Sequence, residues 1–451
     1  MLFVSAVLLS SAALFAFLFN PALGVALLFV AKPVVDANWG TALFMGMPLT
    51  QLVAGAVPCF VLAQLALTKP HASLSRMPLM GLWALYAGYQ STMVWVTLGQ
   101  QDWMLGANVA LRTLNGFAGF YMVQAFCHEE RERRRWLLAL VLAGLFPVGV
   151  GLYQAATGVV WRTEYQDVEG LLRYTGLYHD VIMVRHYTFQ TILALLLLAA
   201  LNPRASWPAR SGMVLYLAAA TLVMLKAYSK AGLVTLALWG LCWTLLQRKL
   251  WTLVLLSAIG AVLAVSVASD LSGNIVTIFQ KELGFLGGSV EADRTLNGRW
   301  YIWQDMLSEW AKLDAISRLF GSGKVGLGAH NDYLQVLFHG GVVGLALYAT
   351  LLGAIGWRVL SDLWRRVDPL AVAALLAYLS WMVDTIGLVP SAYSGYQWFV
   401  WGIIGLSLRV RQDERRRVTP VGRPAPVSET AMPSGVIPGL GGERRFPLVS
   451  G

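Results

Sequence analysis

Charged residues are scarce in this sequence: Asp, Glu, Lys and Arg make up 13% of its 451 residues, whereas 57% are hydrophobic. Soluble domains carry about a quarter charged residues, so the composition excludes an ordinary soluble protein. Between the clumped charges lie continuous apolar runs of roughly 17–25 residues, which is the length that crosses a bilayer as a helix. Because these runs do not alternate in polarity, they predict helices and exclude a transmembrane β-barrel.

Cysteine is also rare. The three cysteines, Cys59, Cys127 and Cys242, lack metal-binding spacing, and we interpret them as small buried side chains. No basic residue precedes Lys32, so the first apolar stretch lacks the basic start of a secretory signal, and we expect residues 2–19 to belong to the mature protein. No carboxylate cluster suits Mg²⁺, so we expect neither a metal nor another cofactor.

The apolar runs predict an all-α, polytopic transmembrane helical bundle over residues 1–408, with about 12 spans. If Pro21 separates two true spans, the count rises by one and the N-terminus changes side. The predicted spans are Leu2–Ala31, Thr41–Leu67, Met77–Leu98, Leu105–Phe126, Trp136–Thr157, Val181–Leu201, Gly212–Leu225, Ala231–Leu246, Leu250–Ala268, Asp332–Trp357, Leu370–Leu388 and Gln397–Leu408.

Basic residues fall on every second loop, which is the pattern that orients bacterial inner-membrane proteins with those loops in the cytoplasm. The net charge of +10 therefore reports topology, and we expect no nucleic-acid partner. On the opposite, periplasmic side we expect one long segment, residues 269–331. Residues 409–451 are rich in Pro, Gly and Arg and predict a disordered basic cytoplasmic tail. The basic residues that set this orientation are Arg131, Arg133, Arg134, Arg135, Arg204, Arg210, Arg248, Lys249, Arg358, Arg365, Arg366, Arg415, Arg416 and Arg417.

Several cations lie on the side that the positive-inside rule leaves poor in charge. Arg112 and Arg185 lie inside predicted spans, and Lys226 and Lys230 flank a short outer connection. Ionisable groups within a membrane are costly and by default indicate function. Any one of them could instead extend to the outer headgroups. Together with Arg299 and His330 of the long segment, they indicate an anionic ligand at the outer leaflet.

The long segment contains a second helical pattern. Asn297 and Gly298 can cap a helix that begins near Arg299, in which Trp303 and Trp310 recur at helical spacing. Such a helix either lies in the membrane interface or packs over the bundle. The glycine-rich stretch that follows has no preceding strand and fails the phosphate-binding loop pattern, so we interpret it as a tight turn that leads to His330.

Three motifs in this order resemble the O-antigen ligase and polymerase superfamily of bacterial envelope glycan assembly. They are Ser-Lys-Ala-Gly at 229–232, Asn-Gly-Arg at 297–299, and His-Asn-Asp-Tyr-Leu-Gln-Val-Leu-x-x-Gly-Gly at 330–341. The resemblance covers roughly residues 171–348. The last motif is fairly specific to the superfamily, but it does not separate ligases from polymerases.

The resemblance implies a GT-C-like bundle that uses an undecaprenyl-pyrophosphate-linked glycan as donor, without a metal. It implies that His330 and Arg299 are catalytic and that Lys230 and Arg185 bind the pyrophosphate. The positions of Arg112 and Lys226 among the outer cations add these two residues to the expected pyrophosphate site. Lys230 stands where the family has arginine, which keeps the charge but loses the bidentate fork. Asn331 and Asp384 are possible further site residues. The chemistry of these residues indicates the same reaction without the resemblance. Arginines can stabilise a pyrophosphate leaving group, and a histidine can accept the proton of an attacking hydroxyl.

The sequence does not identify the molecule that accepts the glycan. A ligase would transfer the glycan to lipid A–core, a polymerase would extend another lipid-linked repeat, and a protein-glycosylating relative is a third form. A transporter or flippase for an anionic lipid is the alternative from another class. It would favour repeated halves and a polar path through the bundle, whereas the deeper spans here are apolar.

Overall fold

The computed structural model describes residues 1–44, 46–67, 77–98, 103–159, 161, 167–168, 171–247, 269–290, 298–323, 328 and 330–418. Its elements in chain order are α1 (Leu2–Phe19), α2 (Pro21–Asp36), β1 (Ala42–Phe44), β2 (Met47–Pro48), α3 (Leu49–Leu67), α4 (Met80–Thr97), α5 (Trp103–Phe126), α6 (Glu130–Ala143), α7 (Leu145–Thr157), β3 (Asp167–Val168), β4 (Leu171–Leu172), α8 (Val181–Leu201), α9 (Trp207–Lys226), α10 (Lys230–Gln247), α12 (Ser269–Leu286), α13 (Arg299–Ala311), α14 (Ala315–Phe320), α15 (Asp332–Arg365), α16 (Pro369–Gly387), η3 (Pro390–Ala392) and α17 (Ser394–Val418).

The chain is an all-α, multi-pass membrane protein, as the sequence predicts. Within the described ranges, seven helical stretches are long and apolar enough to cross a membrane: Leu2–Phe19, Leu49–Leu67, Glu130–Thr157, Val181–Leu201, Trp207–Lys226, Asp332–Arg365 and Pro369–Gly387. The strands form two short antiparallel pairs, β1 with β2 and β3 with β4, and both pairs lie in connections between helices. The predicted span Leu250–Ala268 lies outside the described residues.

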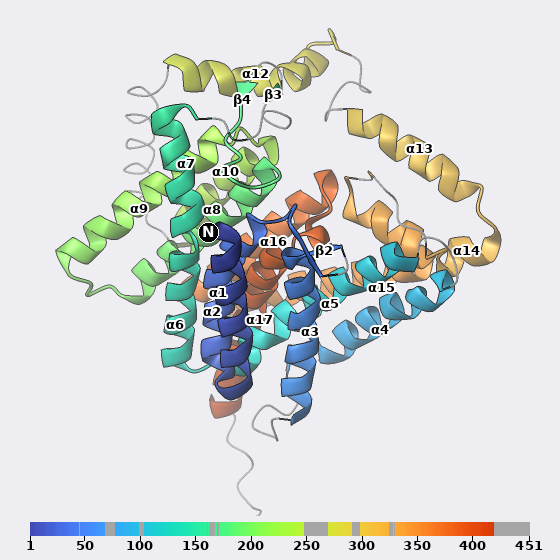
Figure 1. Ribbon diagram of the computed structural model, residues 1–451, viewed down its shortest axis with the longest axis horizontal. Coiled ribbons are helices and arrows are strands. Elements are labelled where there is room, and N and C mark those ends of the chain that lie inside the picture. Colours follow the sequence, from blue (N-terminus) through green and yellow to red (C-terminus); the bar gives the residue numbers. More distant parts are fainter. Residues whose placement is uncertain are drawn as a thin grey trace, which may run out of the picture. The chain divides into compact units, whose positions relative to one another are not determined.

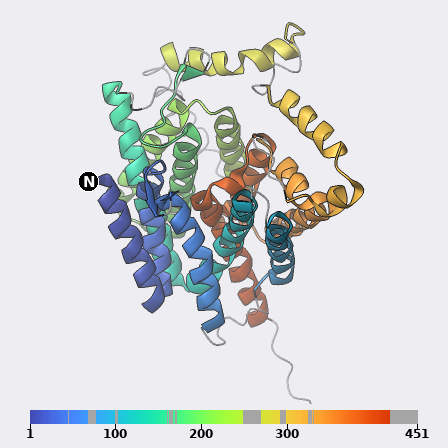
Figure 2. The same cartoon turned by 45° about the vertical axis from the view of Figure 1, so that its right-hand side comes forward.

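The first predicted span is two helices that separate at Pro21, and of the two α1 is long and apolar enough to cross a membrane. α1 ends at Phe19, and the side chain of Asn20 accepts a hydrogen bond from the backbone N–H of Leu23 to cap α2. The two helices lie side by side (Figures 1 and 2). They approach so closely that a Cβ at Gly24 would lie 2.3 Å from the Cα of Phe17. Pro21 breaks the run because proline supplies no N–H to continue the preceding helix.

The core of the bundle gathers around α8, whose side chains are buried along most of the helix. Bulky aromatic side chains from α6, α10, α16 and α17 fill the space around it. Large aromatic rings carry much apolar area and pack edge to face, which fixes the helices against one another. The largest fully buried members from these four helices are Trp136, Trp239, Trp381, Trp398 and Trp401.

The two ends of the bundle hold different elements. β3, β4 and α12 lie at the end that is uppermost in Figure 1, and α6 begins at the opposite end. At that opposite end, Arg411 pairs with Asp368 and donates a hydrogen bond to the backbone oxygen of Arg366 at 3.3 Å. α17 ends at Val418, so the helix extends into the predicted tail, which was expected to be disordered from residue 409. The rest of that tail, residues 419–451, lies outside the described residues.

The long segment holds more helix than the sequence indicated. α13 begins at Arg299, as predicted, directly after Gly298 with φ +74°. Met306 is its one buried residue within the described range, and Trp300 is 46% exposed, so α13 does not pack broadly onto the bundle. α12 was not predicted. It rests on the bundle through a small apolar cluster that includes Ile278 and Tyr228.

A crossing of two glycine-bearing segments shapes the approach to His330. α15 is kinked at Gly341, which has φ +64°. The chain after α14 passes this kink so closely that a Cβ at Gly321 would lie 2.2 Å from the backbone oxygen of His339. Tyr89 joins the two segments, because its hydroxyl lies 2.7 Å from the backbone oxygen of Phe320 and 2.9 Å from that of Gly340, as a donor to both. The Gly-Gly pair of the third motif is therefore a point of backbone contact.

Candidate active site

The site is built outward from Arg185, one turn into α8. Asp180 caps this helix by accepting a hydrogen bond from the backbone N–H of Met183 at 3.0 Å. The cap fixes where α8 begins, so Arg185 faces the packed interior and is only 3% exposed. A guanidinium buried this far must be hydrogen-bonded and paired with a carboxylate to be tolerated.

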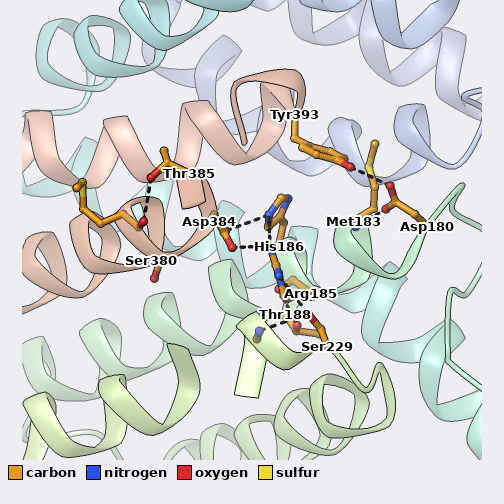
Figure 3. Close-up of polar contacts among 12 residues, drawn as sticks. Asp180, Met183, Arg185, His186, Thr188, Ser229, Ser380, Asp384, Thr385 and Tyr393 are labelled. Carbon is orange, nitrogen blue, oxygen red and sulfur yellow. Dashed lines mark hydrogen bonds and ion pairs between the residues drawn. The ribbon is translucent and has the colours of Figure 1, made fainter. Parts of the chain in front are cut away.

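Asp384 on α16 supplies that carboxylate. Arg185 Nη2 donates to Asp384 Oδ1 at 2.6 Å, and His186 Nε2 lies 3.4 Å from Asp384 Oδ2 (Figure 3). The two ion-pair partners are 3% and 1% exposed. Arg185 and Asp384 therefore join α8 to α16 deep in the bundle, although they are 199 residues apart in the sequence.

The Ser-Lys-Ala-Gly motif holds the other side of Arg185. Arg185 Nη1 donates to Ser229 Oγ at 3.1 Å, and the same oxygen accepts from the backbone N–H of Gly232 at 3.3 Å. A Cβ at Gly232 would lie 2.9 Å from Cδ of Arg185. The serine of the motif thus orients the guanidinium, and the glycine leaves room for the stem of the arginine.

Arg299 and Asn331 meet at the C-terminal end of α16. Arg299 Nη1 lies so near that end that a Cβ on Gly387 would be 3.1 Å from it. Asn331 Nδ2 donates to the backbone oxygen of Ile386 at 3.2 Å, and Asn331 Oδ1 accepts from the N–H of Leu334 to cap α15. Both contacts lie within one turn of Asp384. The helix α16 therefore brings the start of α13 and the start of α15 to the same place.

His330 precedes this cap and is exposed, with a left-handed backbone at φ +43°. Left-handed backbone is strained for a residue other than glycine, and such strain is concentrated at functional sites. Desolvation, followed by the positive charge of Arg299, lowers the pKa of His330 below its usual value. At neutral pH the ring is consequently neutral and keeps a lone pair with which to accept a proton.

The positive charges of the site act on one another. Desolvation, and then the charges of Arg185 and Arg173, lower the pKa of Arg299, although the guanidinium remains charged at neutral pH. Arg299 acts on His330, and Arg185 and Arg173 act on Arg299, so the three guanidinium groups make the site positive, while Asp384 compensates Arg185. Such a site favours a ligand that carries more than one negative charge.

The two lysines lie at the edge of this cluster. Lys230 Nζ donates to both carboxylate oxygens of Glu282 on α12, at 2.8 and 2.9 Å. Lys226 is in the last turn of α9, where its backbone oxygen accepts from the N–H of Tyr174 at 3.2 Å. The structure therefore assigns Lys230 a carboxylate partner that the sequence did not indicate.

Arg112 lies in a separate environment. It lines a cavity of about 30 Å³ together with Asp332, Ser391 and Gln397, and its Nε donates to Asn108 Oδ1 at 3.2 Å. The structure thus brings Arg185, Arg299, His330, Asn331 and Asp384 together around the end of α16. It places Arg112, which was expected to bind the pyrophosphate as well, beside the buried aspartate of the His-Asn-Asp motif.

Sequence reasoning missed several polar groups near the site. His186 stacks on the ring of Tyr396, with centroids 3.7 Å apart and planes 3° apart. Lys32 pairs with Asp36 on α2, and Asp36 Oδ2 accepts from the Tyr187 hydroxyl at 2.5 Å. The sequence did contain features that indicate these groups. His186 adjoins Arg185 within an apolar span, and Lys32 and Asp36 have the i, i+4 spacing of a helical ion pair.

In the described part of the chain, no three His, Cys, Asp or Glu side chains gather where they could hold a metal ion. Comparison with protein-family models and with curated proteins gave no match for the chain. A functional assignment therefore depends on the residues themselves and on their geometry.

Proposed function

We propose that this protein transfers a glycan from undecaprenyl pyrophosphate to an acceptor hydroxyl, without a metal, as an O-antigen ligase-like enzyme. The observation that carries the proposal is the meeting of Arg185, Arg299 and His330 at the end of α16. Two of these groups are fixed cations and the third is a histidine that is neutral at physiological pH. This combination suits the displacement of a pyrophosphate by a hydroxyl, because the cations stabilise the leaving group and the histidine can accept the proton.

In the proposed reaction the acceptor hydroxyl oxygen attacks the anomeric carbon of the donor glycan. A new carbon–oxygen bond forms as the bond between that carbon and the pyrophosphate oxygen breaks, and the leaving group takes the electron pair. His330 accepts the hydroxyl proton through its neutral ring. Arg299 stabilises the charge that grows on the pyrophosphate, with Arg185 held in place by Asp384 and Ser229 as a second cation.

The proposal also covers location and fold. A polyprenyl pyrophosphate has its charged group at the membrane surface, so the site belongs at the periplasmic face of the inner membrane, with the Arg-rich end of the bundle in the cytoplasm. About 12 spans in a GT-C-like arrangement fit the apolar runs of the sequence. Membrane lipids surround the bundle and the donor reaches the site laterally from the outer leaflet.

The acceptor separates the ligase from its alternative, a repeat-unit polymerase of the same superfamily. Both use the same donor and the same leaving group, so the cluster of Arg185, Arg299 and His330 serves either. Purified protein supplied with lipid-linked repeats alone and with lipid A–core added distinguishes them. Chain extension in the first mixture indicates a polymerase, and product on lipid A–core indicates a ligase. A transporter would give no glycosidic product in either mixture.

The proposed site is tested by Arg299→Ala and His330→Ala, measured by glycan transfer in a null strain with membrane levels checked by blot. We expect a loss of about 10²–10³-fold for Arg299→Ala and about 10²–10⁴-fold for His330→Ala. Arg318→Ala, an exposed arginine on α14, and His128→Ala, between α5 and α6, are matched controls that should keep activity. Full activity of both site variants at normal expression would show that the site is wrongly assigned.

A further inference from the structure

A second charged network lies behind the His330–Asn331 turn. Asp332, the next residue along the chain, is 2% exposed. Its Oδ1 accepts from Ser391 Oγ at 2.6 Å, and its Oδ2 accepts from the Tyr348 hydroxyl at 2.7 Å. Ser391 lies on η3, so this carboxylate joins the start of α15 to the connection between α16 and α17.

The network extends in both directions from Asp332. The Tyr348 hydroxyl accepts in turn from Trp381 Nε1 at 3.0 Å, and the backbone oxygen of Ser391 accepts from Gln397 Nε2 at 2.6 Å. Every described hydrogen bond to the carboxylate comes from a neutral hydroxyl. A buried carboxylate that keeps its charge requires a cation as well, because desolvation costs more than two neutral hydrogen bonds return.

Arg112 is placed to be that cation. It lines the same cavity as Asp332, and the two charges attract each other across it. The cavity, about 30 Å³, exceeds the roughly 10–15 Å³ that a water molecule needs, and its lining includes the side chains of Ser391 and Gln397 as well as the two charged groups. The structure gives these two described residues no direct ion pair, so they interact across the cavity. The guanidinium therefore has a carboxylate of the protein itself as a counter-charge.

We propose that Arg112 and Asp332 form a buried charge pair that positions His330, and that Arg112 does not contact the donor. Asp332 holds the first turn of α15 against η3, and Arg112 supplies the counter-charge for its carboxylate. His330 stands two residues before Asp332, so the pair fixes the turn from which the histidine reaches the acceptor. Both residues are positioning residues, and the inference rests on the proposed function only for its kinetic consequences.

The decisive experiment is a double-variant cycle with Arg112→Met and Asp332→Asn, read by kinetics and by thermal unfolding in detergent. Each single variant leaves one charge buried without its partner. We expect kcat to fall by about 10²-fold, as a misplacement on the order of 1 Å costs, while KM for the lipid-linked donor stays unchanged. Arg112→Lys, which keeps the charge, should retain most of the activity.

The double variant removes both charges and should recover activity and unfolding temperature relative to the worse single variant, because contacting residues are not additive. The matched control is Arg135→Met with Glu132→Gln, an ion pair on α6 that is partly exposed and should show little coupling. If the single variants do not accumulate in membranes, renewed accumulation of the double variant supports the pair, and continued loss overturns it.

Two other results would overturn the inference. A raised donor KM with normal kcat in Arg112→Met would make Arg112 a donor contact. Strictly additive effects in the double variant would show that Arg112 and Asp332 act separately. Failure of the proposed function is recognised differently: the unaltered protein would then give no glycosidic product. The double-variant cycle of Arg112 and Asp332 could still be read in that case from the unfolding temperatures.

Discussion

Arg185 Nη2 and Asp384 Oδ1 are 2.6 Å apart in the interior of the bundle, and each side chain is almost fully buried. One guanidinium therefore has two functions. Its charge is compensated by α16, and its second nitrogen is oriented by Ser229 towards the connection that carries Lys230. The pair makes the proposed anion site part of the packing of α8 against α16.

Removing the carboxylate of this pair should destabilise the protein. Asp384→Ala leaves Arg185 buried without its counter-charge, a change that costs about 3–5 kcal/mol when one partner of a buried pair is removed. We expect a lower unfolding temperature in detergent and reduced membrane levels. Asp305→Ala, at an exposed position on α13, is the matched control and should unfold like the unaltered protein. Equal stability of the two variants would contradict the pairing.

The contact between Lys230 and Glu282 separates two functions of the lysine. If Lys230 binds pyrophosphate, Lys230→Arg should keep activity, Lys230→Ala should lose most of it, and Glu282→Gln should lower KM for the donor by freeing the ammonium group. If Lys230 serves only to hold α12, Glu282→Gln should cause the same loss as Lys230→Ala. Donor titrations of the three variants distinguish these outcomes. We expect the first, because anionic lipid and carboxylate compete for one cation.

The rate of transfer should depend on pH through His330. Because the pKa of this histidine is lowered from 6.5, its ring stays neutral to a more acidic pH than usual. kcat/KM should therefore be constant near neutrality and fall only as the pH decreases below about 6.5, where the ring becomes protonated. In the residual activity of Arg299→Gln, loss of the neighbouring positive charge should move this decline to higher pH. A rate that rises on acidification would identify His330 as an acid.

A glycine on α15 should be intolerant of substitution where the backbone of the preceding loop approaches it. Gly341 has φ +64°, and a Cβ there would lie 2.4 Å from the backbone nitrogen of Gly321. Gly341→Ala should cost about 1–3 kcal/mol in backbone strain, with the clash in addition, and should lower transfer by displacing the approach to His330. Gly353→Ala in the same helix has open space around it and should be neutral or slightly stabilising. Comparable behaviour of the two variants would contradict this account of the crossing.

Chelation should leave activity intact. The proposed mechanism uses arginine where many pyrophosphate-dependent enzymes use Mg²⁺, so purified protein treated with EDTA should transfer glycan at an unchanged rate. The measurement is a single-donor transfer assay with and without EDTA. A loss that Mg²⁺ or Mn²⁺ restores would show that a cation takes part in the reaction.

The sequence alone determined that the chain is a helical membrane protein, because apolar runs of spanning length have one stable form in lipid. It also proposed Arg185, because charge inside an apolar span is costly enough to indicate function, and Arg299 and His330, from the long segment and its motifs. It located the start of α13 from the turn at Gly298. These are properties of composition and of local backbone preference.

Only the tertiary structure decided which charges are partners. Asp384 and Arg185 are 199 residues apart in the sequence, and nothing local links them. The same holds for Lys230, whose partner Glu282 lies on a helix that the sequence analysis missed. Pairing of buried charges depends on which faces of the helices meet, and helical periodicity specifies the face of each helix but not its neighbour.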